Sequence, residues 1–222
     1  MQDLKIDIGC GGAKKEGFLG IDYVAFPGVD YSVDLNSAGL PFPDQSVSHI
    51  FTSHFLEHVT NVRWDGLFKE MTRVAQDKAQ IEIWNPYVFT NAAFISGHLS
   101  QLNEDQYLHM GVYFPAQWSK ALGAFWTIKE FQYVVSEQTL IDLSENNISL
   151  SHALRYYKEV VREFGVFIEV CRGEYQPVTP IKTFSIESRD GEKHLLKQEV
   201  YADNKKANLL QKAVGQFSEK KL

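Results

Sequence analysis

Three glycines that follow a short apolar stretch form the first candidate ligand site. The stretch 4–8 has the composition of a buried strand, and Gly9, Gly11 and Gly12 come directly after it. Glycines at the end of a strand let backbone N–H groups approach a ligand that a Cβ atom would hold away. In open α/β folds such a turn lies at the carboxyl edge of the sheet, where ligands bind. A plain tight turn is the alternative explanation for the glycines alone.

Carboxylates end each of the first three predicted strands. Asp7 precedes the glycines, Asp22 ends a predicted strand at 18–23, and Asp34 ends another at 30–35. A carboxylate in the second position can accept both hydroxyl groups of a ribose, and one in the third can pair with an adenine. Asp7 can hold backbone N–H groups of the loop or accept from a ligand's ammonium group. A single aspartate at a strand end is often only a cap, but three in this order predict one ligand-binding rim.

Two histidines follow the fourth predicted strand, 47–52, and are the candidate catalytic residues. Histidine titrates near neutral pH, so a general base drawn from His54 and His58 would typically accelerate a reaction 10²–10⁴-fold. The two are one helical turn apart if this segment is helical, and both would then face the ligand site. The alternative is that one caps a helix and the other packs beneath the following segment.

The same residues also match a metalloprotease pattern. His54-x-x-Glu57-His58 has the spacing of the inverted zinc-protease motif. That motif requires a helix that presents both histidines to one metal, with a third ligand elsewhere. Here a strand precedes the histidines, so a zinc hydrolase is disfavoured and we expect no metal site. Glu57 is equally compatible with a solvent-facing helix position.

An α/β framework is needed to position these groups. The alternation of apolar stretches with turns predicts a doubly wound, mostly parallel Rossmann-like sheet. A fifth strand is expected at 80–84 and a helix at 62–75. Residues 88–126 carry aromatics and histidines without a clean period and are expected to form an inserted lid with the acceptor pocket. Its candidate acceptor residues are Tyr107, His109, Tyr113 and Trp118.

The rest of the chain has weaker signals. Strands are expected at 131–135, 166–171 and 181–187, with the last two paired as a hairpin, and a helix is expected at 151–164. Lysines between apolar residues in 192–222 predict an amphipathic C-terminal helix or tail. With 222 residues, the chain is expected to form a single domain.

Composition narrows the classes of function and partner. A formal net charge of −6 argues against a nucleic-acid partner, because phosphates favour basic surfaces. No run of about 18 apolar residues is present, so no membrane partner is expected, and 1–9 is too short and polar for a signal peptide. Two cysteines, Cys10 and Cys171, exclude a disulfide framework but permit one bridge. These features lead us to expect a cytoplasmic protein.

The order of these motifs resembles that of class I S-adenosylmethionine-dependent methyltransferases, in particular small ones with a shortened first crossover. The resemblance covers about residues 4–86. It rests on Asp7-Ile-Gly-Cys-Gly-Gly, Gly20-Ile-Asp22, Asp34-Leu35, Leu40-Pro-Phe-Pro-Asp44-Gln-Ser-Val-Ser-His-Ile50, Ser53-His-Phe-Leu-Glu-His58 and Phe68-Lys-Glu-Met-Thr-Arg-Val74. Two features depart from the family: Ala13 stands where a third loop glycine is usual, and the first crossover has room only for a turn and a stunted helix.

The resemblance implies S-adenosylmethionine as cofactor and assigns roles to individual residues. Gly9 and Gly11 would hold the methionine part, Asp22 the ribose, and Asp34 with Leu35 the adenine. Two further residues, Asp7 and Ser53, are grouped with this cofactor-binding set. The predicted function is methyl transfer to a small-molecule or saccharide acceptor, at oxygen.

Two alternatives remain open at this point. The first is a catalytically inactive binding module built on a cofactor fold. The second is an NAD(P)-dependent oxidoreductase. Against it, Lys14 stands where the G-x-G-x-x-G fingerprint has its third glycine, and Asp22 comes too early to be the fingerprint's ribose-binding acid.

Overall fold

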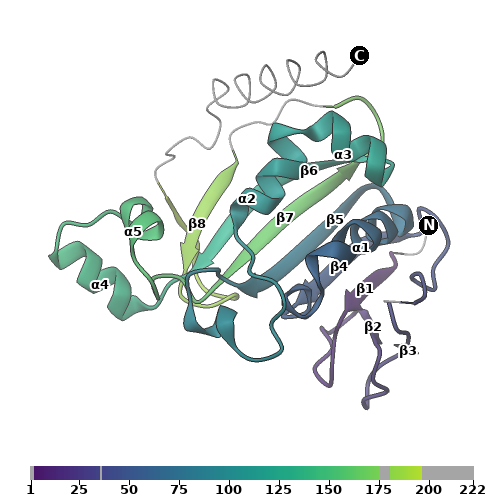
Figure 1. Ribbon diagram of the computed structural model, residues 1–222, viewed down its shortest axis with the longest axis horizontal. Helices are drawn as coiled ribbons and strands as arrows, with labels where there is room; N and C mark the ends of the chain where they lie inside the picture. The colour runs from purple at the N-terminus through teal and green to yellow at the C-terminus, as the bar shows by residue number, and fades with distance from the viewer. Residues whose placement is uncertain (1–2, 36, 176–180, 197–222) are drawn as a thin grey trace.

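A mixed, mostly parallel sheet forms the centre of the molecule (Figure 1). The computed structural model describes residues 3–35, 37–175 and 181–196. Within them the strand order is β3-β2-β1-β4-β5-β7-β6-β8-β9. The strands are β1 (Lys5–Ile8), β2 (Leu19–Asp22), β3 (Tyr31–Ser32), β4 (Val47–Ser53), β5 (Ala75–Pro86), β6 (Phe125–Val134), β7 (Glu163–Cys171), β8 (Lys182–Ile186) and β9 (His194–Leu195). The predicted α/β class with a Rossmann-like sheet is confirmed.

Two strands, β7 and β9, run against the direction of the others. Strands β1 to β5 pair in parallel, β7 runs antiparallel to both β5 and β6, and β8 is parallel to β6. The chain order reverses between β1 and β4, and the carboxyl ends of these two strands therefore flank a topological switch point. Open α/β sheets bind their ligands at such a point.

Among the described residues, helices connect the strands only from β4 onward. They are α1 (Asn61–Val74), α2 (Glu104–Leu108), α3 (Pro115–Leu122), α4 (Glu137–Glu145) and α5 (Leu150–Tyr156), with short turns η1 (Leu56–His58), η2 (Asn91–Phe94) and η3 (His109–Tyr113). The predicted lid segment 88–126 contains η2, α2, η3 and α3 before β6 begins. Within the described residues, no helix is long and apolar enough to cross a membrane.

Apolar burial is unequal on the two faces of the sheet. The larger core packs α1 against one face, with fully buried Ile6, Ile50, Phe68 and Met71 among its members. On the other face the core is small, and the residues in it come from strands and one loop: Phe18, Phe51, Trp84, Val134 and Ile186. No described helix contributes to this second cluster.

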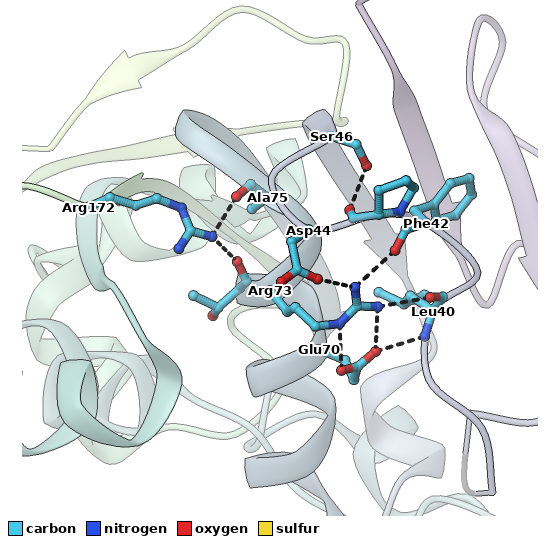
Figure 2. Close-up of polar contacts among 10 residues, drawn as sticks. Leu40, Phe42, Asp44, Ser46, Glu70, Arg73, Ala75 and Arg172 are labelled. Carbon is cyan, nitrogen blue, oxygen red and sulfur yellow. Dashed lines mark hydrogen bonds and ion pairs between the residues drawn. The ribbon is translucent and has the colours of Figure 1, made fainter.

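The segment between β3 and β4 is tied to α1 by one arginine (Figure 2). The Arg73 guanidinium donates to the carbonyl oxygens of Leu40 and Phe42, both at 2.9 Å, and to Asp44 at 2.7 Å. It also pairs with Glu70, whose carboxylate accepts the Leu40 N–H at 2.9 Å. A planar fork with five donors suits this arrangement, which holds the crossover in place where it enters β4, at the amino edge of the sheet.

Several expectations are corrected beyond 86. The predicted hairpin of the last two long strands is wrong, because β6 lies between β7 and β8. The predicted helix at 151–164 ends at Tyr156, and the chain turns through Glu159 at φ 64° before entering β7. Strand β6 begins at Phe125, six residues before its prediction, and α4 was not expected. Both cysteines are free, and most of the predicted C-terminal helix, 197–222, lies outside the described residues.

Candidate active site

A cavity of about 670 Å³ opens at the switch point between β1 and β4. Its walls come from the turn after β1, the ends of β2 and β3, and the segment from β4 into α1. The lining residues are Gly9, Ile21, Asp22, Tyr23, Val24, Phe26, Val33, Asp34, Leu35, His54, Phe55, His58, Val59, Arg63 and Leu67. Pockets for small ligands and cofactors have this size and this mixture of apolar walls with a few polar groups.

The glycine turn adopts a backbone conformation that other residues rarely take. Gly9 has φ 71° and Gly11 has φ 53°, both in the left-handed region. A Cβ atom on Gly9 would lie 2.4 Å from the ring of Phe55, whereas one on Gly11 would meet no atom within 4 Å. Gly9 is therefore required for close packing of the turn on the segment after β4. Gly11 is open on that side and lies outside the cavity's lining residues.

Asp22 and Asp34 contribute carboxylates to the same cavity as Gly9. Asp22 Oδ2 accepts the Gly11 N–H at 2.9 Å, and Oδ1 accepts the Val24 N–H at 3.0 Å. A carboxylate has about four lone-pair sites, so Asp22 keeps capacity for further donors. Asp34 is exposed and follows β3, with Leu35 beside it on the cavity wall. The structure thus brings together four of the residues grouped as cofactor-binding: Gly9, Asp22, Asp34 and Leu35.

Asp7 and Ser53, grouped with them from the sequence, do not line the cavity. Asp7 is 2% exposed, and its Oδ2 accepts the Lys15 N–H at 2.8 Å, which fixes the far end of the glycine turn. Burial raises the pKa of Asp7, partly offset by this hydrogen bond. The Ser53 hydroxyl accepts from Arg189 at 2.7 Å. Asp7 therefore orders the backbone of the glycine turn, and Ser53 binds the Arg189 side chain, away from the cavity surface.

His54 lies on the cavity wall but both of its ring nitrogens are engaged. Nδ1 contacts Glu57 Oε1 at 3.2 Å, and Nε2 contacts Glu163 Oε2 at 2.9 Å. The hydrogen bonds with Glu163 and then Glu57 raise the pKa of His54 to about 9, against the opposing effect of burial. His54 also has φ 51°, an uncommon conformation for a residue other than glycine. It is best described as an imidazolium held between two carboxylates.

Glu163 links this histidine to the loop after β8. It accepts two hydrogen bonds from the Arg189 guanidinium, at 2.6 and 3.2 Å. Burial alone would raise the pKa of Glu163, but the bonds with His54 and Arg189 outweigh it and lower the pKa to about 2. Neither Glu163 nor Arg189 was predicted from the sequence, because each lies more than 100 residues from His54 and neither belongs to a motif.

Among the described residues, only one ring nitrogen of His58, at the cavity wall, has a hydrogen-bond partner. Its Nδ1 lies 3.0 Å from the carbonyl oxygen of Gly97. A carbonyl only accepts, so Nδ1 carries the proton and Nε2 keeps its lone pair. His98 is adjacent, with its ring centroid 4.8 Å from that of His58. The zinc-protease motif, which the sequence disfavours, requires one helix that presents both histidines; here η1 spans only Leu56–His58, and His54 lies before it and contacts Glu163.

The predicted acceptor residues of the lid do not line the cavity. Tyr107 is 1% exposed and its hydroxyl accepts from Asn85. Trp118 donates its indole N–H to His109 at 3.0 Å, and Tyr113 packs against the larger core. These aromatics belong to the larger hydrophobic core or pack on it. The lid reaches the neighbourhood of the cavity instead through Gly97 and His98, for which the sequence offered no signal.

No protein-family model matches the chain, and no curated protein matches its sequence. Solved structures with a similar fold exist. A methyltransferase dependent on S-adenosylmethionine from Archaeoglobus fulgidus is 18% identical and has a TM-score of 0.49, with 74% of this chain and 85% of that one covered. One from Mesorhizobium loti is 11% identical with a TM-score of 0.47, over 75% and 90% of the two chains. In fold, the chain resembles these methyltransferases.

A third similar structure is phosphoethanolamine N-methyltransferase 2 from Haemonchus contortus, bound to phosphomonomethylethanolamine and S-adenosylhomocysteine. It is 15% identical with a TM-score of 0.49, and the match covers 77% of this chain but only 49% of that one. The likeness concerns the fold, and at these identities it says nothing about the acceptor of this chain.

Proposed function

We propose that this chain is an S-adenosylmethionine-dependent methyltransferase that acts on a small-molecule or saccharide acceptor, at oxygen. The observation that carries the proposal is the shared cavity of Gly9, Asp22 and Asp34. Each comes from the end of a different strand, and a glycine turn followed by two carboxylates is the set expected for an adenosyl ligand with a cationic amino acid part. A doubly wound fold alone would not decide the reaction.

The residues present fit this cofactor. Asp22 would accept the ribose hydroxyls, and Asp34 and Leu35 would contact the adenine. The apolar part of the wall, which includes Val33 and Leu67, offers contact for a flat ring. When bound, S-adenosylmethionine supplies a methyl group that its sulfonium already activates, so the chain's main task is alignment.

His58 is the better candidate of the two histidines for a base. Both ring nitrogens of His54 are occupied by Glu57 and Glu163, whereas Nε2 of His58 has an available lone pair beside the cavity. An acceptor hydroxyl near His58 could pass its proton to Nε2 as its oxygen forms the new bond to carbon. His54, as a cation in this account, keeps Glu57 and Glu163 in place.

One structural observation disfavours the oxidoreductase alternative. Dinucleotide-binding folds seat the pyrophosphate on the N-terminus of the helix that follows the glycine turn. Here the described residues 9–18, between β1 and β2, contain turns and no helix. An NAD(P) pyrophosphate would therefore lack its usual partner.

Calorimetric titration with S-adenosylhomocysteine tests the proposal, with NAD⁺ as the competing ligand. We expect one S-adenosylhomocysteine per chain and no comparable binding of NAD⁺. Absence of binding at millimolar S-adenosylhomocysteine, in a sample shown to be folded, would refute the cofactor assignment. Binding without turnover on any hydroxylated acceptor would instead support the inactive binding module.

A further inference from the structure

The geometry points to a divalent transition-metal site formed by Glu57, His58 and His98 at the wall of the cavity. One ligand atom from each of the three residues lies within 4.8 Å of those of the other two. The sequence led us to expect no metal, because the motif that it offered, His54 with His58, follows a strand and lacks the helix that a zinc-protease motif requires. The candidate site uses His58 with a histidine 40 positions later in the chain and is independent of the methyl-transfer proposal.

The strongest observation is a buried carboxylate oxygen without a partner. Glu57 is only 2% exposed. Its Oε1 is held by His54 at 3.2 Å, while Oε2 has no hydrogen-bond partner among the described residues. Leaving a buried acceptor unsatisfied is costly, more so when the group is charged. A bound cation would remove that cost, and His54 already fixes the orientation of the carboxylate.

The two imidazoles each present a suitable nitrogen. The Gly97 carbonyl binds the Nδ1–H of His58, which leaves Nε2 as the ligand atom. Metal-binding histidines commonly donate their other N–H to a carbonyl or carboxylate in this way. Nδ1 of His98 is buried and has no partner among the described residues. Both lone pairs are thus unclaimed within the part of the chain that the structure describes.

Backbone hydrogen bonds hold the two contributing segments together. The N–H groups of Leu99 and Ser100 both donate to the carbonyl oxygen of Glu57, at 2.7 and 3.2 Å. The Ser100 hydroxyl donates to the carbonyl oxygen of Val59 at 2.7 Å. His98 is therefore fixed next to Glu57 and His58 before any metal binds, which reduces the ordering cost of binding.

The donor set favours a transition metal over Mg²⁺ or Ca²⁺. Two imidazole nitrogens with one carboxylate suit Zn²⁺, Fe²⁺, Co²⁺ or Mn²⁺, whereas Mg²⁺ and Ca²⁺ prefer oxygen ligands. Zinc bonds of about 2.0–2.2 Å place tetrahedral ligand atoms about 3.4 Å apart. Small side-chain rotations would bring the three atoms to that spacing. Three protein ligands leave at least one position open.

The open position gives the site a role that does rest on the proposed function. His58 lines the cavity, so an acceptor oxygen could bind the metal there and its proton would become more acidic. His58 would then act as a metal ligand and not as a free base. An acceptor oxygen bound in this way would be positioned for methyl transfer.

Metal titration of chelator-treated, untagged protein tests the site in the absence of any cofactor. We expect one Zn²⁺ per chain by calorimetry and one Co²⁺ with ligand-field absorption bands, while Mg²⁺ binds at least 10-fold more weakly. His98→Ala should weaken Zn²⁺ binding at least 10-fold, and E57Q should do the same. His152→Ala, at an exposed histidine on α5, is the matched control and should bind as the wild type does.

Stoichiometric Zn²⁺ binding that His98→Ala leaves unchanged would overturn the site, as would its absence in folded wild type. Circular dichroism checks that each variant folds. If E57Q does not fold, H58A provides the second test of a ligand residue. S-adenosylhomocysteine binding is measured separately on the metal-free protein. Failure of the metal site and failure of the cofactor assignment are therefore distinguishable.

Discussion

Asp22 Oδ2 accepts the backbone N–H of Gly11 at 2.9 Å, so the carboxylate proposed to hold the ribose also holds the glycine turn. Its other oxygen accepts the Val24 N–H. One side chain therefore joins the turn after β1 to the segment after β2 while it remains on the cavity wall. Changes at this position are expected to affect ligand affinity more than stability, because the surrounding strands keep their own core.

Asp22→Ala is predicted to weaken S-adenosylhomocysteine binding about 10–100-fold, the equivalent of one hydrogen bond to a charged group. Calorimetry measures the affinity, and thermal unfolding measures the stability and shows that the variant is folded. Asp65→Ala, at an exposed carboxylate on α1, is the control and should change neither. Equal affinities for the wild type and Asp22→Ala would remove the ribose assignment.

Alanine substitutions along the glycine turn should rank in a fixed order. Gly9→Ala combines a left-handed φ with a Cβ 2.4 Å from Phe55, so it should cost about 2–5 kcal/mol of unfolding free energy. Gly11→Ala has the strained φ without the clash and should cost about 1–2 kcal/mol. Gly12→Ala has neither feature and should be close to neutral. Urea denaturation measures all three, and a reversed order would contradict the described turn.

Arg73 is predicted to stabilise the crossover between β3 and β4. Arg73→Ala leaves the Leu40 and Phe42 carbonyls and the Glu70 carboxylate without their shared donor, at a cost of about 2–4 kcal/mol. Arg73→Lys should recover only part of it, because an ammonium lacks the planar fork. Denaturant unfolding tests this, with Lys69→Ala on the exposed face of α1 as control. If Arg73→Lys matched the wild type, the fork geometry would be unimportant.

Glu82 should make stability depend on pH in the acid range. Burial would raise its pKa, but the nearby His49, with Nε2 3.6 Å away, and the hydrogen bonds from Lys15 and Trp84 outweigh burial and lower the pKa to about 2. A group whose pKa falls on folding stabilises the protein above its unfolded pKa, near 4.5, and this contribution is lost as the pH drops toward 2.

Glu82→Gln should therefore cost about 1–3 kcal/mol at pH 7, and its difference from the wild type should shrink between pH 4.5 and 2. Unfolding free energies measured across this range provide the test. Glu145→Gln, at an exposed position on α4, should show no such pH dependence relative to the wild type. A difference for Glu82→Gln that stays constant down to pH 2 would contradict the assignment.

The sequence predicted the first half of the fold well because its signals are local there. Strands β1, β2, β4 and helix α1 follow from apolar stretches between glycines and turn residues, and each predicted bound differs from the observed one by at most one residue. After residue 86 the local sequence patterns predict the wrong elements in several places. Val160, Val161 and Phe164 continue a helical pattern in the sequence, but they lead into the long central strand β7, where tertiary pairing decides.

The candidate site was predictable to the extent that its residues follow strand ends. Gly9, Asp22 and Asp34 share an edge because parallel strands end together. His98 and Glu163 were not predictable, since their positions depend on long-range contacts of a loop and of an antiparallel strand with the segment after β4. A spacing rule that considers one stretch at a time cannot bring such residues together.

A crystal structure of the chain with S-adenosylhomocysteine tests the central claim most directly. The account predicts the ligand in the cavity at the β1–β4 switch point, with the ribose hydroxyls on Asp22 and the adenine beside Asp34 and Leu35. A ligand bound elsewhere, or a cavity that stays empty at saturating ligand, would contradict it.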